Sequence, residues 1–323
     1  MNIFYITLES VAVLLGIGII GFFIIRQRVL PTKVLAALTP LALDIALPSL
    51  IFVDILSDFN PEVYPSWWQY PLWWMFFTVV AFTLTFLFSF LSHKHFRNEF
   101  RLSLFYQNGI FFPLALFSGM FPHEPRYIVT LFLFTIFYPA FFFSTYPLFF
   151  KSRSIESGTS KKTHFSLKKT FHPALIATIA AIFISLFSIQ FIVPDLIFSI
   201  LSLLGAMTVP LLMIILGGNI YVNYKQHGVS NLKETMKFTL VKNICFPLLF
   251  LPVLYLIAPL VPSEILFLLF LQSAVPPITA IPVVTKRLGG NDGLTGQFVV
   301  SSFLFSLISL PLMIVLYDVV IGL

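Results

Sequence analysis

The sequence predicts an all-α membrane protein of ten transmembrane helices, arranged as two inverted five-helix repeats. Three observations support this fold class. Hydrophobic residues make up 58% of the 323-residue chain and charged residues only 10%, whereas soluble domains contain about 25% charged residues. Ten apolar stretches each approach the ~20 residues that cross a hydrocarbon layer about 30 Å thick. The basic residues, finally, gather in alternate connectors between these stretches.

The predicted spans follow one another along the whole chain. By the positive-inside rule, connectors one, three, five, seven and nine face the cytoplasm, because they hold every Lys and Arg except Arg126. Both termini are therefore expected outside the cell, and the net charge of +6 reflects topology instead of nucleic-acid binding. The spans cover about 4–25, 34–56, 70–91, 101–120, 126–149, 172–192, 196–220, 238–258, 264–285 and 294–317.

A polar stretch rich in Ser, Thr and Lys, at 151–170, separates spans five and six and is expected to be a flexible cytoplasmic linker. It divides the chain into a first five-helix repeat, 1–150, and a second, 171–323. Because five is an odd number, the second repeat would enter the membrane in the opposite orientation.

An internal match supports a fold shared by the two repeats. Gln272 lies 164 residues after Asn108, so that QNGIFFP in span four can be laid over LQSAVPP in span nine. In this alignment an amide falls on an amide and a proline on a proline. Pro210 in span seven likewise lies 162 residues after Pro48 in span two.

Spans four and nine are predicted to be broken near their middles. A proline inside a helix removes a hydrogen bond and costs about 3 kcal/mol, and in hydrocarbon the freed groups need shelter within protein or beside water. The prolines could merely kink the helices, but broken helices also form binding sites, where helix N-termini favour an anion. The predicted substrate-binding residues are Asn108, Gly109, Pro113, Gln272, Ser273, Pro276 and Pro277.

Three further positions in the spans call for an explanation. Asp44 would lie about 15 Å into the bilayer, as a proton-coupling site, a cation ligand or a hydrogen-bonded acid in helix packing. Lys242 is near the cytoplasmic boundary, and we expect its ammonium group to extend to the interface. Gly217 and Gly218 indicate close helix packing or a helix terminus.

Catalytic and metal-binding motifs are absent from the sequence. The chain contains no HExxH, CxxC, GxSxG or DDxxD pattern, and its single Cys245 excludes an internal disulfide. His93 and His95 lie in a basic loop, where a solvated role is favoured over metal binding. We therefore expect no enzyme, no cofactor and no metal. An intramembrane transferase, the alternative from another class, would need an acid-rich or histidine motif at the membrane surface.

Five segments carry a resemblance to a known family: GIGIIGFFIIRQRVL, LTPLALDIALPSLIF, QNGIFFPLAL, TVPLLMIILGGNI and SAVPPITAIPVVTKRLGGNDGLTGQFVVSSFLFSLISLPL. They resemble the auxin efflux carrier family, bacterial permeases similar to the plant PIN auxin exporters. The resemblance implies a fold similar to sodium/bile-acid symporters and sodium/proton antiporters, in which helices four and nine cross. It also implies a scaffold of helices 1, 2, 6 and 7, which often forms a homodimer, and a mobile domain of helices 3–5 and 8–10.

The resemblance further implies a secondary carrier of the cytoplasmic membrane that moves a small organic anion by an elevator mechanism. Malate, malonate and auxin-like carboxylates are substrates of this family. Asp44 matches no motif of the family, so proton symport, sodium symport and uncoupled transport all stay open. A sodium-coupled symporter of the bile-acid type is the alternative within transporters.

Overall fold

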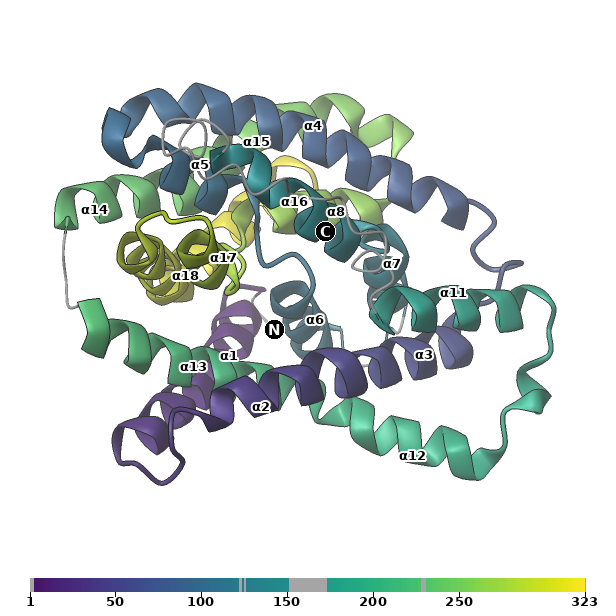
Figure 1. The fold of residues 1–323 in the computed structure, drawn as a ribbon. Helices are drawn as coiled ribbons and strands as arrows, with labels where there is room; N and C mark the ends of the chain where they lie inside the picture. The colour runs from purple at the N-terminus through teal and green to yellow at the C-terminus, as the bar shows by residue number, and fades with distance from the viewer. Residues whose placement is uncertain (1–2, 122–123, 125, 151–172, 228–230, 323) are drawn as a thin grey trace.

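The computed structural model describes residues 3–121, 124, 126–150, 173–227 and 231–322, and every regular element in these ranges is a helix. The predicted linker lies outside the described residues. The helices form two groups that face one another across the molecule. Figure 1 shows α2, α12 and α13 along its lower edge and α4 and α15 along its upper edge.

The first group contains the helices that we predicted to be the scaffold. Contacts join α1 to α13, α2 to α13, and α3 to both α11 and α12. A π-helical turn, Leu41–Ala46, connects α2 to α3, and Pro48 stands in the first turn of α3. The helices are α1 (Ile3–Arg26), α2 (Val34–Pro40), α3 (Leu47–Asp58), α11 (Pro173–Leu186), α12 (Asp195–Ala206) and α13 (Thr208–His227).

The second group holds the remaining helices. A second π-helical turn, Val241–Cys245, joins α14 to α15. The helices are α4 (Tyr70–Phe88), α5 (Arg97–Phe105), α6 (Phe111–Met120), α7 (Arg126–Phe134), α8 (Tyr138–Thr145), α14 (Leu232–Leu240), α15 (Phe246–Ile257), α16 (Ser263–Ala274), α17 (Ile281–Arg287) and α18 (Asp292–Val320).

In the part of the chain that the structure describes, six helical runs are long and apolar enough to cross a membrane, and three apolar helices are shorter. The shorter helices are α6, α11 and α16. Ten spans in two inverted repeats therefore stay a prediction, although every predicted stretch is largely helical where it is described. The predicted span 126–149 is not one helix, because α7 ends at Phe134 and α8 begins at Tyr138 with Pro139 in its first turn.

Close packing of α1 on α13 depends on glycines, as predicted for Gly217 and Gly218. A Cβ atom on Gly217 would lie 2.7 Å from the carbonyl carbon of Gly18, and one on Gly218 would lie 2.7 Å from a methyl group of Leu35. Both contacts are shorter than van der Waals separation, so larger residues would force the helices apart. The alternative that these glycines mark a helix end is wrong, since α13 continues to His227.

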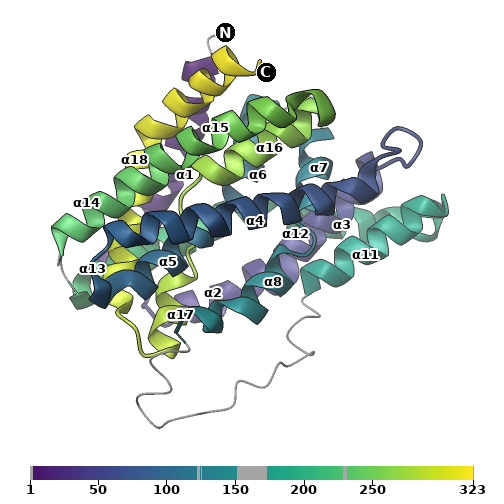
Figure 2. The ribbon, with the colours of Figure 1, turned by 90° about the horizontal axis from the view of Figure 1, so that it is seen from above.

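The outer surface has the exposed apolar side chains expected of a protein in lipid. Large apolar side chains such as Leu196, Leu203 and Leu256 are more than two-thirds exposed, whereas the backbone is hydrogen-bonded within helices, as a bilayer requires. Both termini lie at the same end of the molecule, where α1 and α18 run side by side (Figure 2).

Candidate functional site

Two helix interruptions, residues 106–110 and 275–280, lie against each other in the interior of the second group, and we call them the paired breaks. The first separates α5 from α6, and the second separates α16 from α17. The Asn108 N–H donates to the Pro276 carbonyl at 2.7 Å, and the Ile278 N–H donates to the Tyr106 carbonyl at 2.9 Å. Each break thus satisfies backbone groups of the other, which lipid could not do.

The two breaks do not correspond in the register that the sequence match suggested. The helices before the breaks end at Phe105 and Ala274, which are 169 residues apart (274 − 105), not 164. Pro113 in the first turn of α6 therefore corresponds to Pro282 at the start of α17. Pro276 and Pro277 instead lie within the extended break, because a residue that precedes a proline disfavours the helical conformation.

Gln272 and Ser273 belong to the last turns of α16, directly before the second break. The Gln272 side-chain nitrogen donates to the Gly109 carbonyl at 2.6 Å, and its oxygen accepts a 3.2 Å bond from Gln107. Gly109 packs against this amide so closely that a Cβ atom would lie 3.0 Å from its Cδ. The Ser273 hydroxyl donates to the Phe270 carbonyl at 2.6 Å. Direct substrate contact by either side chain stays a prediction.

Asn108 differs from these residues because its side chain has no hydrogen-bond partner. The residue is 1% exposed, and both the Oδ1 and the Nδ2 atom are buried and unpaired. Nearly all buried polar groups in proteins are hydrogen-bonded, so an exception at a helix break points to a missing water, ion or ligand. Among the predicted site residues, this one retains both a donor and an acceptor for a substrate.

Lys242 corrects our expectation from the sequence. Its side chain does not extend to the membrane interface but is fully buried at 0% exposure. The ammonium group donates to the Ser273 carbonyl at 3.0 Å and lies 4.7 Å from the centre of the Phe246 ring. Distance along the sequence from the end of a span could not reveal this, because α16 packs against the π-helical turn that holds Lys242. The π-helical turn that holds Lys242 is a feature found often at functional sites, and it is visible only in the structure.

Asp44 lies outside the paired breaks, in the first helix group. It is exposed on the π-helical turn between α2 and α3, and it lines a shallow cavity with Pro48 of α3 and with Ala177 and Leu201 of α11 and α12. Its predicted role in ion coupling stays a prediction.

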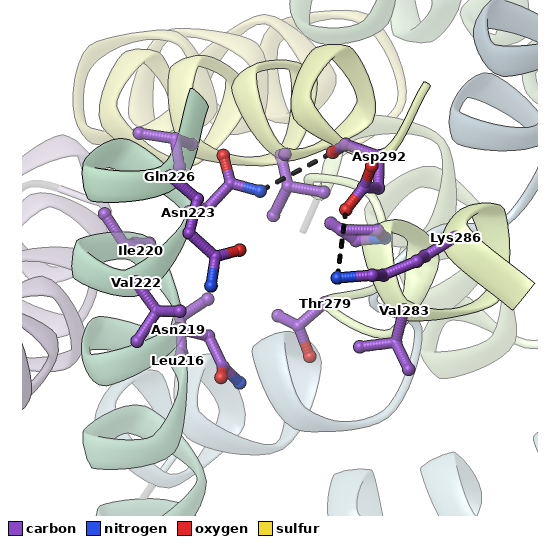
Figure 3. Close-up of a pocket in the computed structure, with 14 residues that line it drawn as sticks. Leu216, Asn219, Ile220, Val222, Asn223, Gln226, Thr279, Val283, Lys286 and Asp292 are labelled. Atoms are coloured by element: carbon purple, nitrogen blue, oxygen red, sulfur yellow. Dashed lines mark hydrogen bonds and ion pairs between the residues drawn. The ribbon is translucent and has the colours of Figure 1, made fainter. Parts of the chain in front are cut away.

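A cavity of about 260 Å³ leads toward the paired breaks from the predicted cytoplasmic side (Figure 3). Thr279, in the second break, lines it together with Lys286 of α17 and Asp292 of α18, whose charged groups lie 4.0 Å apart. On the opposite wall α13 presents Asn219, Asn223 and Gln226, which share one face because they are four and three residues apart. The predicted span ended at residue 220, so the sequence reading missed this polar face of α13.

A second cavity, of about 600 Å³, lies toward the predicted outer side. Its walls come from α1, α3, α12 and α13 on one side and from α6 and α7 on the other. Two acidic residues, Glu9 and Asp54, line it together with Ser118 of α6. Both cavities are thus bordered by the two helix groups. The cytoplasmic one is lined by amides and by the ion pair of Lys286 with Asp292, and the outer one by two acids.

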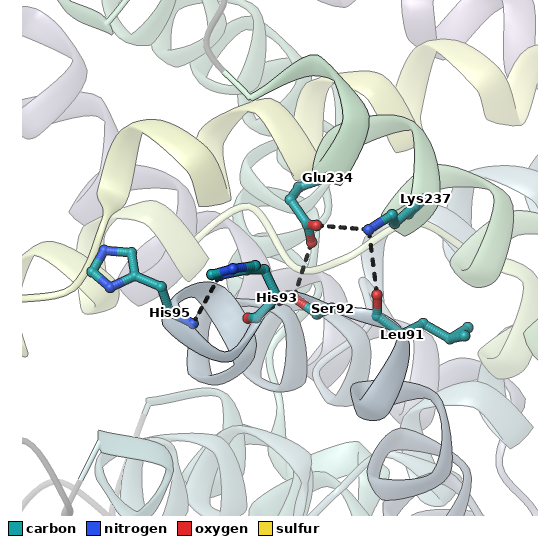
Figure 4. Close-up of polar contacts among 6 residues, drawn as sticks. All are labelled: Leu91, Ser92, His93, His95, Glu234 and Lys237. Carbon is teal, nitrogen blue, oxygen red and sulfur yellow. Dashed lines mark hydrogen bonds and ion pairs between the residues drawn. The ribbon is translucent and has the colours of Figure 1, made fainter.

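The basic loop between α4 and α5 holds α14 in place and does not assemble a metal site in the described residues (Figure 4). The Ser92 hydroxyl donates to Glu234 at 3.0 Å, and Lys237 donates to Glu234 at 2.9 Å and to the Leu91 carbonyl at 3.4 Å. The Nδ1 atom of His93 accepts a hydrogen bond from the backbone of His95 at 3.4 Å.

A helical protein with membrane-spanning helices, interrupted helices in its interior and a polar cavity that reaches them belongs to the class of membrane transporters. A family model described as membrane transport protein matches residues 6–314. The chain therefore belongs to this family, the auxin efflux carrier family, whose members are transporters and not enzymes. No curated protein matches the chain.

Proposed function

We propose that the protein is a secondary carrier for a small organic anion and binds it at the crossing of the broken spans four and nine. The observation that carries this proposal is the unpaired, buried amide of Asn108 beside the start of α6. An Nδ2 donor and the free N–H groups of a helix N-terminus suit a carboxylate. The amides of α13 would offer further hydrogen-bond donors to the same ligand in the cytoplasmic cavity, where Lys286 is paired with Asp292.

The two cavities support an elevator-type movement of the second helix group against the first. Each cavity is bordered by both groups, on opposite predicted sides of the paired breaks. Sliding of one group against the other would open one cavity to the substrate while it closes the other. We place the carrier in the cytoplasmic membrane with both termini outside, as a homodimer through its scaffold helices, which native mass spectrometry of the purified protein would test.

Replacement of Asn108 tests the substrate site. Asn108→Ala should lower uptake of radiolabelled malate, malonate or indole-3-acetate into proteoliposomes by about tenfold or more, because a substrate hydrogen bond is lost. The melting temperature should stay equal or rise, since the alanine removes an unpaired buried amide. Loss of function without loss of stability separates a ligand contact from a structural one.

Asn60→Ala is the matched control, because Asn60 is exposed in the outer loop and bonds only locally, to the Glu62 N–H. It should leave uptake unchanged. Full activity of Asn108→Ala with every transported carboxylate would remove Asn108 from the site, and the absence of uptake of any carboxylate by the wild type would contradict anion transport itself.

A further inference from the structure

Three carbonyl groups in or beside the paired breaks already accept hydrogen bonds from side chains. Within the first break, the Gly109 carbonyl accepts from Gln272 and the Gln107 carbonyl accepts from the Tyr138 hydroxyl. The Ser273 carbonyl, in the last turn of α16, accepts from Lys242. Carbonyl oxygens at helix C-termini carry partial negative charge, and those of broken helices are ligands for cations in transporters. In the described residues, the protein itself therefore supplies the donors that these carbonyls need.

Lys242 is the charged member of this set. Its ammonium group lies at the C-terminal end of α16, where the helix dipole favours a positive charge. The face of the Phe246 ring, 4.7 Å away, adds a second favourable interaction. The π-helical turn, Val241–Cys245, brings the side chain to this position from the neighbouring helix pair.

No carboxylate lies within ion-pair distance of Lys242 in the part of the chain that the structure describes. A buried charge without a counter-ion is costly in hydrocarbon, and a single carbonyl and a ring compensate it only in part. The nearby break also holds the unpaired amide of Asn108, whose N–H bonds to Pro276, three residues beyond Ser273. An anion bound at Asn108 would supply the missing negative charge.

We propose that the ammonium group of Lys242 occupies the position at the C-terminal end of α16 that a cation from solution would otherwise take. The same ammonium group provides the positive charge that retains the substrate anion. The inference rests on the proposed anion transport and deepens it. It assigns to Lys242 a positioning role, since the ammonium acts through the Ser273 carbonyl and through its charge. It follows that transport requires no sodium.

Sodium dependence of the wild-type protein is the first test. Proteoliposomes that take up radiolabelled malate, malonate or indole-3-acetate should do so at equal rates in sodium and in choline buffers. Without any substrate, sodium should leave the melting temperature of the detergent-purified protein unchanged, because a cation that bound the native state would raise it. Uptake that requires sodium, or a saturable rise of the melting temperature with sodium, would overturn the proposal while anion transport itself would stand.

Replacement of the charge is the second test. Lys242→Met keeps an unbranched side chain, one heavy atom shorter, and removes the charge, so that the half-saturation concentration for the anion should rise by about tenfold or more. The melting temperature should change little, because removal of an uncompensated buried charge offsets the loss of the hydrogen bond to the Ser273 carbonyl. Lys233→Met is the matched control, since Lys233 lies exposed on α14. A wild-type half-saturation concentration in Lys242→Met would reject the role of the ammonium group, and the sodium test decides the case if that variant does not fold.

Discussion

Individual side chains at the paired breaks divide into those that hydrogen-bond the backbone and those without a hydrogen-bond partner among the described residues. Gln272 belongs to the first kind, because both ends of its buried amide bond within the protein. Asn108 belongs to the second. The sequence identified both residues as members of the site but could not separate their roles, since both are amides beside a break and only packing determines which one is paired.

Removal of the Gln272 amide should cost stability. In Gln272→Ala the Gly109 carbonyl and the Gln107 amide lose their partner in a buried place, at about 1–3 kcal/mol for each unpaired group. The melting temperature in detergent should therefore fall, and Gln27→Ala, at an exposed position after α1, should leave it unchanged. An unchanged melting temperature in Gln272→Ala would show that the amide does not stabilise the paired breaks.

At the scale of the elements, the sequence predicted the existence of the breaks and missed their register. Proline and glycine within apolar spans identified both interruptions, because the backbone rules that they follow are local. The correspondence of Pro113 with Pro282 depends on where α5 and α16 end, and a match of amides and prolines along the chain cannot give this. The burial of Lys242 was missed for the same reason, since it depends on the packing of α16 against a neighbouring helix.

The contact of α1 with α13 should be the most sensitive to side-chain size. Gly217→Ala places a Cβ atom against the backbone of α1 near Gly18, and overpacking of this kind costs about 1–3 kcal/mol. Gly16→Ala is the control on α1 itself, because nothing lies within 4 Å of its added Cβ atom; it should be neutral or stabilising. Thermal unfolding of both variants measures the difference, and equal melting temperatures would mean that the helices separate at no cost.

The whole molecule consists of two helix groups with a cavity at each predicted side of the membrane. Composition was sufficient for the membrane class, because hydropathy acts on the chain as a whole. The family followed from the resemblance of particular segments, such as TVPLLMIILGGNI. Neither composition nor these segments could reveal the cavities, whose walls come from helices distant in sequence, such as α13 and α17.

A disulfide between the groups tests whether they move against each other. Ser10 lies on α1 and Gly119 on α6, and a Cβ atom on Gly119 would lie 3.0 Å from that of Ser10. A shift of about half an ångström or more brings this pair into the range of about 3.5–4.5 Å found in disulfides. In a Cys245→Ser background, the pair Ser10→Cys and Gly119→Cys should cross-link on oxidation, and this should abolish carboxylate uptake until a reductant restores it. Each single cysteine variant should transport under both conditions. Full uptake by the cross-linked protein would exclude movement of α6 along α1, because a closed disulfide allows no displacement of the two helices by more than a few ångströms.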